Sequence, residues 1–231
     1  MLLLRKASTA IPAVQKLHPE LVTVLEDIKD QAERVELYGA SSLMGVSPAL
    51  ARIAQFVTHH GAGVYSIPYL NPHYCHELRG VFSRGGYTVN PQEPEPAQIP
   101  EIVLEHACKP LFDCLAVLWA QTAAPLARIL WNMDPDIVGS IQAAEYDSHR
   151  HRETAWHLDA ESDVTLVVNL GSDFKGGGTE LAPGFGFANI TVPPLPSGHG
   201  LFFKGRSTLH RGLAVEEGTR TLLVHWTQLN S

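Results

Sequence analysis

The stretch His157-Leu158-Asp159, followed by the apolar run at 164–170 (VTLVVNL) and by Gly176-Gly177-Gly178-Thr179, is the part of the sequence that decides the fold. In a β-strand, residues i and i+2 point to the same face, so an H-x-D on a strand directs an imidazole and a carboxylate at one point. The run that follows is rich in β-branched residues and predicts a buried strand. Consecutive glycines then permit a tight turn that other residues would resist.

His210 completes a candidate metal site. It lies between two apolar runs of strand character, at 200–203 and 221–224. Two imidazoles and one carboxylate on one side of an octahedron leave three positions open, which is the arrangement of non-haem Fe(II) oxygenases. Because the chain contains 12 histidines, an H-x-D pair could also arise by chance. The strand and the glycine turn that follow favour the metal interpretation.

The same order of motifs resembles the 2-oxoglutarate- and Fe(II)-dependent oxygenases, and among them the prolyl and lysyl hydroxylase-like branch. The residues that carry the resemblance are the H-x-D, the strand, the glycine turn, Leu209-His210-Arg211-Gly212 and a basic residue ten positions after the second histidine, Arg220. An upstream segment, 64–78, looks like the strand-to-helix opening of the same domain. The resemblance covers roughly 64–231 and is weak before that.

This resemblance implies a set of cofactors and ligands. His157, Asp159 and His210 would be the only protein ligands of one Fe(II), with 2-oxoglutarate as co-substrate and O2 as oxidant. Two other classes use a similar site. A zinc hydrolase could employ the same three ligands but would need a separate general base, and a non-catalytic barrel would be expected to have a degraded triad.

Three further residues are candidates for binding the co-substrate. Arg220 would point inward among apolar groups and would demand an anion, either Glu180 or Asp163 in an internal salt bridge or the distal carboxylate of 2-oxoglutarate. The resemblance implies that an upstream tyrosine borders the co-substrate, and Tyr146 stands at that place. Asn169 lies on an otherwise apolar strand and could bond the same carboxylate, although the family often has tyrosine there.

The order of elements predicts an α+β fold. Helical periodicity fills the N-terminal half, whereas short strands separated by Gly and Pro begin at residue 137. Ligands on non-adjacent strands, together with helices first and strands last, favour a double-stranded β-helix, or jelly-roll barrel, braced by N-terminal helices. We expect residues 1–63 to be a helical extension packed on the barrel and residues 64–231 to be the oxygenase domain.

Helix positions can be predicted in the N-terminal half. Ser47-Pro48 and Asn71-Pro72 are typical helix starts, and 102–131 predicts a long helix broken near Pro110 and Pro125. The proline-rich stretch 90–96 predicts a solvated connector. Another helix is indicated by apolar residues at helical spacing: Leu21, Val24, Leu25, Ile28, Ala32 and Val35.

Composition limits the partners. With 231 residues, 45% of them hydrophobic, the chain can bury a full core without disulfides. The formal charge is −7 and the longest basic run is Arg150-His151-Arg152, so we expect no nucleic-acid partner. The cysteines, Cys75, Cys108 and Cys114, match no zinc pattern and predict buried thiols.

The sequence also predicts a cytoplasmic protein without a membrane partner. The apolar residues 1–4 precede Arg5-Lys6 and are too few for a signal-peptide core. No uninterrupted apolar run approaches the roughly 18 residues that span a bilayer.

The substrate is not readable from the motifs. Specificity is expected in the loops 148–156 and 185–196 and in the N-terminal extension. Because 148–154 (SHRHRET) is rich in groups suited to an anion, we favour a small, carboxylate-bearing metabolite, although the loop could equally be a solvated turn. Hydroxylation of prolyl or lysyl residues in a protein substrate is the alternative.

Overall fold

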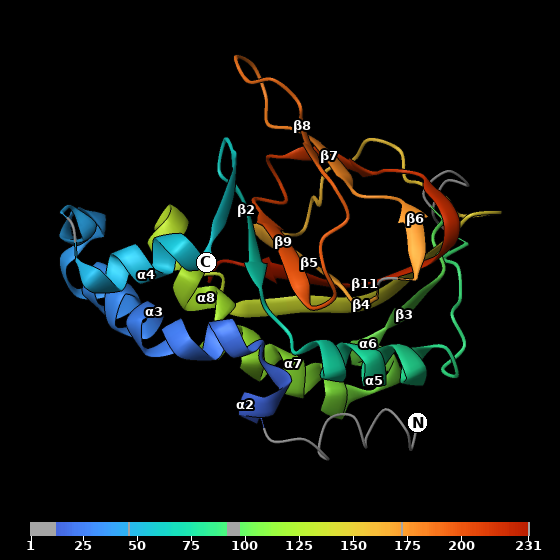
Figure 1. The fold of residues 1–231 in the computed structure, drawn as a ribbon, viewed down its shortest axis with the longest axis horizontal. Helices are drawn as coiled ribbons and strands as arrows, with labels where there is room; N and C mark the ends of the chain where they lie inside the picture. Colours follow the sequence, from blue (N-terminus) through green and yellow to red (C-terminus); the bar gives the residue numbers. More distant parts are fainter. Residues whose placement is uncertain (1–12, 46, 92–97, 172, 231) are drawn as a thin grey trace.

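The computed structural model describes residues 13–45, 47–91, 98–171 and 173–230. Its largest element is an antiparallel sheet of eight strands in the order β1-β2-β9-β5-β11-β4-β3, with β6 beside β11 (Figure 1). The strands are β1 (Thr58–Gly61), β2 (Val64–Pro68), β3 (Glu101–Val103), β4 (Ile137–Asp147), β5 (Val164–Asn169), β6 (Phe174–Gly176), β9 (His199–Phe203) and β11 (Val215–Gln228).

A smaller antiparallel sheet lies above the large one in Figure 1. It has the order β10 (Leu209–Gly212), β7 (Thr179–Ala182) and β8 (Ile190–Val192). The segment 154–157 runs along the free edge of β10, where the Thr154 N–H donates to the Gly212 carbonyl at 3.2 Å. The glycine turn predicted before β7 is present, because Gly176, Gly177 and Gly178 all have positive φ.

The H-x-D motif does not lie on a regular strand, so that part of the prediction is wrong. His157 forms an isolated bridge with His210, and Leu158 and Asp159 follow in irregular backbone. The chain leaves the edge of β10 after one bridge because it must cross to the large sheet, where β5 begins at Val164.

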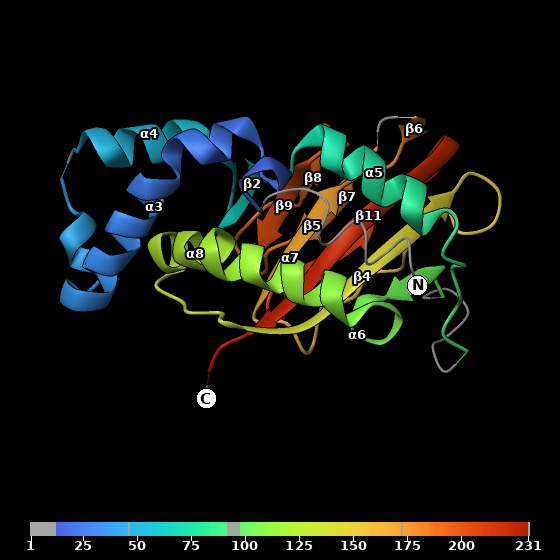
Figure 2. The ribbon, with the colours of Figure 1, turned by 90° about the horizontal axis from the view of Figure 1, so that it is seen from below.

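The longer helices lie on one side of the large sheet, where Figure 2 shows α5 and α7 lying across its strands, while α3 and α4 extend beyond its end. The predicted starts are confirmed, since Ser47 and Asn71 cap their helices through their side chains. The helices are α2 (Ala13–Lys16), α3 (Pro19–Tyr38), α4 (Pro48–Phe56), α5 (Pro72–Phe82), α6 (Leu104–Ala107), α7 (Lys109–Gln121) and α8 (Ala123–Trp131), with a 3₁₀ turn at Ala40–Leu43.

The start of the long helix predicted at 102–131 is wrong. Ile102 lies in β3, where it pairs with Ala143 of β4, and the helical part begins only at Leu104. A short apolar run does not distinguish a strand from a helix, which is why periodicity misplaced this start. The two predicted breaks are confirmed near Pro110 and Pro125, and both prolines fall in the first turn of a helix, α7 and α8. The predicted connector lies mostly outside the described residues, at 92–97.

One helical stretch, Lys109–Trp131, is long and apolar enough by length and composition to cross a membrane, and 39% of its most apolar window is buried inside the protein. Leu115, Leu118 and Trp119 belong to the main core of the molecule. Part of this apolar stretch therefore packs against the large sheet, while Val117 is exposed.

Side chains of the large sheet alternate between two hydrophobic layers. On the helix side, Leu166, Phe202 and Leu223 join the core formed with α3 and α7. On the other side, Leu181 and Leu201 pack between the two sheets. β5 is covered on both faces, as its sequence predicts. Cys75 and Cys108 are buried and Cys114 is half-buried, all three as free thiols.

Candidate metal centre

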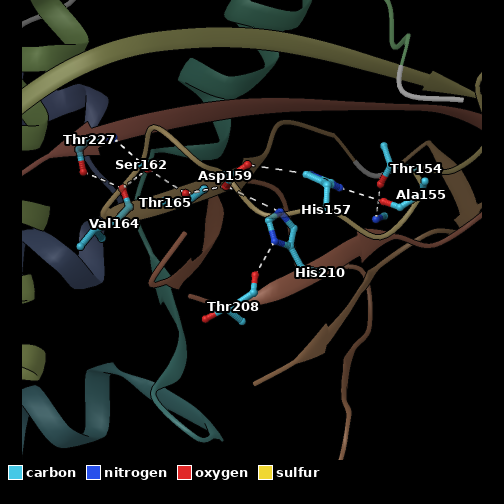
Figure 3. Close-up of polar contacts among 11 residues, drawn as sticks. Thr154, Ala155, His157, Asp159, Ser162, Val164, Thr165, Thr208, His210 and Thr227 are labelled. Atoms are coloured by element: carbon cyan, nitrogen blue, oxygen red, sulfur yellow. Dashed lines mark hydrogen bonds and ion pairs between the residues drawn. The ribbon is translucent and has the colours of Figure 1, made fainter. Parts of the chain in front are cut away.

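His157, Asp159 and His210 converge between the two sheets. Their potential ligand atoms all lie within 4.8 Å of one another, and no other group of at least three His, Cys, Asp or Glu side chains in the described residues does so. Nε2 of His157 is 3.9 Å from Oδ1 of Asp159, and Nε2 of His210 is 3.7 Å from Oδ2 (Figure 3). The structure thus assembles the three predicted ligand residues.

The backbone sets the distance between the two histidines. Each of His157 and His210 donates its N–H to the carbonyl of the other at 2.9 Å. Their rings are 4.3 Å apart between centroids. Only His157 is accessible, with 43% of its side chain exposed, against 8% for His210 and 6% for Asp159.

Both imidazoles are oriented by a backbone carbonyl two residues earlier. Nδ1 of His157 lies 2.9 Å from the Ala155 oxygen, and Nδ1 of His210 lies 2.9 Å from the Thr208 oxygen. A neutral histidine that donates from Nδ1 leaves the Nε2 lone pair free for a metal. Burial lowers the pKa of His210, which favours this neutral form.

Asp159 is held by a network of hydroxyl groups. The Thr165 hydroxyl lies 2.7 Å from Oδ2 of Asp159 and 2.9 Å from the Ser162 hydroxyl. Ser162 donates to the Val164 carbonyl and accepts from the Thr227 N–H at 3.1 Å (Figure 3). The ligand carboxylate is therefore tied to β5 and β11 although it lies on irregular backbone.

Gly205 closes the back of this network. A Cβ at this position would lie 2.4 Å from the Thr165 hydroxyl and 2.6 Å from the Ser162 carbonyl. The Gly205 carbonyl also accepts from the Asp159 N–H at 3.2 Å. Only glycine leaves room for the chain to approach the ligand carboxylate this closely.

Arg220 is buried between the sheets, with 5% of its surface exposed. Its Nη1 donates to the Gly178 carbonyl at 2.9 Å, and its Nε has no hydrogen-bond partner among the described residues. Both of the predicted alternative partners are occupied elsewhere: Glu180 pairs with Arg211, and Asp163 pairs with Arg206. Burial lowers the pKa of Arg220, which reflects a guanidinium without a counter-ion.

Tyr146 lies directly opposite Arg220 in the β4–β11 ladder. The guanidinium carbon is 5.9 Å from the centre of the phenol ring, within the range of a cation–π contact. Burial raises the pKa of Tyr146, and the charge of Arg220 opposes that shift. The hydroxyl therefore remains protonated at neutral pH and can donate a hydrogen bond.

A narrow cavity opens beside Arg220. Its free interior measures about 10 Å³, which is the space of about one water molecule. Thr179, Val192 and Leu222 contribute to its walls. Asn169 also lines it, but the Asn169 amide already donates to the Gly171 carbonyl at 2.7 Å and to the Leu195 carbonyl at 2.5 Å. Its amide hydrogens are thus used by the protein itself.

Sequence reasoning missed Thr165 and Gly205. Strand parity does place Thr165 on the inner face of β5, together with Val167 and Asn169, so its direction was predictable. Its contact with Asp159 depends on the path of residues 158–163, for which the sequence carries no periodic signal. Gly205 gave no signal, because its importance lies in contacts that are distant in sequence.

Neither a protein-family model nor a curated protein sequence matches the chain. Solved structures match its fold. SnoK, a non-heme α-ketoglutarate dependent carbocyclase from nogalamycin biosynthesis, has a TM-score of 0.56 at 15% identity, covering 79% of this chain and 84% of its own. An oxidoreductase of the 2OG-Fe(II) oxygenase family from Burkholderia pseudomallei has a TM-score of 0.57 at 14% identity, with 87% and 90% covered.

A prolyl hydroxylase from Trichoplax adhaerens, solved in complex with a peptide fragment of hypoxia inducible factor, has a TM-score of 0.54 at 17% identity. That alignment covers 80% of this chain and 94% of the hydroxylase. At such identities the likeness establishes a shared fold.

Proposed function

We propose that this chain, which shares the fold of 2-oxoglutarate- and Fe(II)-dependent oxygenases, is itself such an enzyme and oxidises a C–H bond of a small, carboxylate-bearing metabolite. The observation that carries the proposal is the convergence of His157, Asp159 and His210 beside a buried arginine that lacks a counter-ion. A metal site alone would suit several chemistries. Because the buried Arg220 lacks a counter-ion, an anion is expected to bind beside it, close to the metal ligands.

The donor set fits Fe(II). Two imidazoles with free Nε2 atoms and one carboxylate form the ligand set of non-haem iron oxygenases. The backbone bonds between His157 and His210 and the Thr165 contact to Asp159 hold these donors in place. When bound, Fe(II) and 2-oxoglutarate together supply the oxidation of a C–H bond by O2, with succinate and CO2 as by-products.

Arg220 and Tyr146 fit one end of 2-oxoglutarate. The free Nε of Arg220 and the neutral Tyr146 hydroxyl can both donate to a carboxylate, and the low polarity around them strengthens such bonds. Because the cavity holds about one water, a five-carbon dicarboxylate would require the cavity to widen. We assign Asn169 to holding the Gly171 and Leu195 backbones rather than to the co-substrate.

The strand order supports the proposed double-stranded β-helix. Eight segments would form it, in chain order β4, segment 154–157, β5, β7, β8, β9, β10 and β11. The centre of the large sheet contains the first, eighth, third and sixth of these segments side by side, namely β4, β11, β5 and β9. The smaller sheet then contains the seventh, fourth and fifth members, and the second, segment 154–157, lies along its β10 edge. This alternation is what a strip of eight strands gives when it is rolled into two facing sheets.

The division into a helical extension at 1–63 and an oxygenase domain at 64–231 is likewise a proposal. Leu21 and Ile28 of α3 belong to the same core as Leu166 of β5. The described part of the extension therefore adds helices and the edge strand β1 to the domain and does not form a separate core.

The preference for an anionic substrate rests on the loop that precedes the ligands. Oδ1 of Asp147 accepts from the N–H groups of His149 and Arg150, at 2.7 and 2.9 Å, which orders the start of this loop. The Arg150 side chain is exposed and has no ion-pair partner among the described residues. A free guanidinium on an ordered loop ahead of the metal ligands can bind a substrate carboxylate.

Two measurements test the proposal. Anaerobic Fe(II) with 2-oxoglutarate should give the weak visible charge-transfer band of the chelate, and Zn(II) should not. Succinate release across a panel of free amino acids and other metabolites then identifies the substrate class. Turnover with carboxylate-bearing metabolites should fall in Arg150→Gln and stay unchanged in Arg84→Gln, whose exposed side chain follows α5 on the helix-covered face.

Hydroxylation of prolyl or lysyl residues in a protein remains the alternative, because the chain shares its fold with the Trichoplax adhaerens prolyl hydroxylase. Coupled turnover with Pro- or Lys-containing peptides only would replace the small-molecule proposal with this one. A zinc hydrolase is disfavoured, since it would leave the unpaired Arg220 without a role.

A further inference from the structure

A second cleft lies on the helix-covered face of the large sheet, between α5 and the strands β4 and β11. It has a volume of about 450 Å³, within the range of about 300–1,000 Å³ typical of small-molecule sites. Ser83 and Arg79 line it from the helix side, and Glu145, Thr219 and Thr221 line it from the strands. Seven of the nine residues that line it carry side chains that can form hydrogen bonds.

Strand alternation separates this cleft from the metal centre. Glu145 pairs with Thr221 across the β4–β11 ladder, and the next pair is Tyr146 with Arg220. Successive side chains of a strand point to opposite faces. Arg220 lines the cavity between the sheets, whereas Glu145 and Thr221 line the outer cleft. The two sites therefore share two strands but no side chains.

The cleft carries one uncompensated negative charge. Asp173 is neutralised by Arg79, whose Nη2 lies 2.6 Å from its carboxylate. Glu145 is half-buried on the floor of the cleft and has no cationic partner and no side-chain hydrogen bond among the described residues. Burial, with a smaller contribution from Asp147, raises the pKa of Glu145, as expected for a carboxylate that lacks a counter-ion.

We propose that this cleft binds a small organic cation, a primary ammonium or guanidinium group, whose charge pairs with Glu145 and whose N–H groups donate to the exposed hydroxyl of Thr219. An anion would meet two carboxylates and only one arginine, which is already paired. An apolar ligand would leave the half-buried Glu145 carboxylate without a partner. A metal ion lacks donors here, because within the described residues only His157, Asp159 and His210 form a cluster of metal-ligating side chains.

Putrescine and methylguanidine are suitable probes, and calorimetric titration into the metal-free protein without 2-oxoglutarate measures their binding directly. Both should bind with a dissociation constant of about 1 mM or tighter. The neutral diol 1,4-butanediol, which matches putrescine in length, should not bind. Comparing the two cations shows whether the group recognised is an ammonium or a guanidinium.

Glu145→Gln removes the charge while keeping the shape, and it should weaken binding of the cations at least about tenfold, which corresponds to about 1.4 kcal/mol. Glu216→Gln is the matched control, because Glu216 is an exposed carboxylate of β11 outside the cleft. Thr219→Val keeps the charge and should weaken binding a few-fold, which tests the site independently if Glu145→Gln fails to fold.

Unchanged affinity in Glu145→Gln, or the absence of saturable binding of either cation up to about 10 mM, would overturn the proposal. Equal losses in Glu145→Gln and Glu216→Gln would show general charge attraction and would overturn it as well. Because neither metal nor co-substrate is present, the result does not depend on the proposed oxygenase activity.

Discussion

His157 and His210, which lie 53 positions apart in the sequence, are hydrogen-bonded to each other through their backbones in both directions, each at 2.9 Å. Their spacing is therefore set by peptide groups and does not depend on a bound metal. A ligand set that is held in this way loses little freedom on binding a metal, which favours affinity.

His210→Ala should lose stoichiometric Fe(II) and all turnover while the fold persists, because the backbone bonds to His157 do not use the imidazole. Metal analysis after anaerobic reconstitution, with circular dichroism as a check on folding, measures both. His149→Ala removes an exposed histidine from a neighbouring loop and should bind iron normally. Full iron occupancy in the His210 variant would contradict the assignment of His210 as a ligand.

Arg220→Leu should weaken 2-oxoglutarate binding by about 2–5 kcal/mol, the usual cost of breaking a buried charge pair, and leave Fe(II) bound. Titrating 2-oxoglutarate into the anaerobic Fe(II) protein and following the visible band gives the affinity. Arg211→Leu is the control, since Arg211 already pairs with Glu180. An unchanged affinity in the Arg220 variant would show that this arginine is structural.

Thr165→Val should lower metal affinity by about 10–100-fold, because the hydroxyl that orients Asp159 is replaced by a methyl group of the same shape. Thr165→Ser keeps the hydroxyl and should retain most of the affinity. Competition with a coloured chelator for Co(II) provides a measure that does not require turnover. If valine and serine behaved alike, the network would have no effect on the metal.

His225 should make the protein sensitive to acid. It is fully buried against Trp119 and Tyr69, and burial lowers its pKa from 6.5 to about 4. Neither ring nitrogen forms a hydrogen bond of good geometry, and the adjacent Leu166 backbone offsets the shift only in part. Between pH 6.5 and 4 the unfolded chain binds the extra proton, so stability is complete above pH 6.5 and falls as the pH approaches 4.

The loss attributable to this histidine is about 3 kcal/mol. Urea unfolding between pH 7.5 and 4, with a chelator present, measures it, and His225→Phe should show a correspondingly shallower pH dependence. His18, His60 and His199 also have pKa values lowered by burial and contribute in the same direction. The difference between the variant and the parent protein isolates His225, and equal slopes would contradict the assignment.

The sequence predicted the residue types of the site better than their backbone setting. His157, Asp159, His210 and Arg220 were identified because their spacing follows a known order of motifs. That order does not specify where the chain leaves a sheet, so the H-x-D was wrongly placed on a strand. The sequence also did not determine the partner of Arg220. Arg211 pairs with Glu180 and Arg206 pairs with Asp163, but these ion pairs form only when the strands are assembled.

Helices were predictable to the extent that their signals are local. The caps at Ser47 and Asn71 act within one turn and gave the correct starts of α4 and α5. Ile102 was misassigned because its strand is only three residues long and is defined by its pairing with Ala143. Thr165 and Gly205 show the same limit, since their roles arise from contacts across the molecule.

The position of β11 has a consequence for how the protein folds. This strand lies between β4 and β5, yet it follows every other strand of both sheets in the sequence. During synthesis β4 therefore cannot pair with β11 until all the other strands have been made. Closing such long loops slows folding, and it leaves apolar strand edges open to wrong partners in the meantime. We expect slow refolding, and aggregation of chains that stop before residue 215.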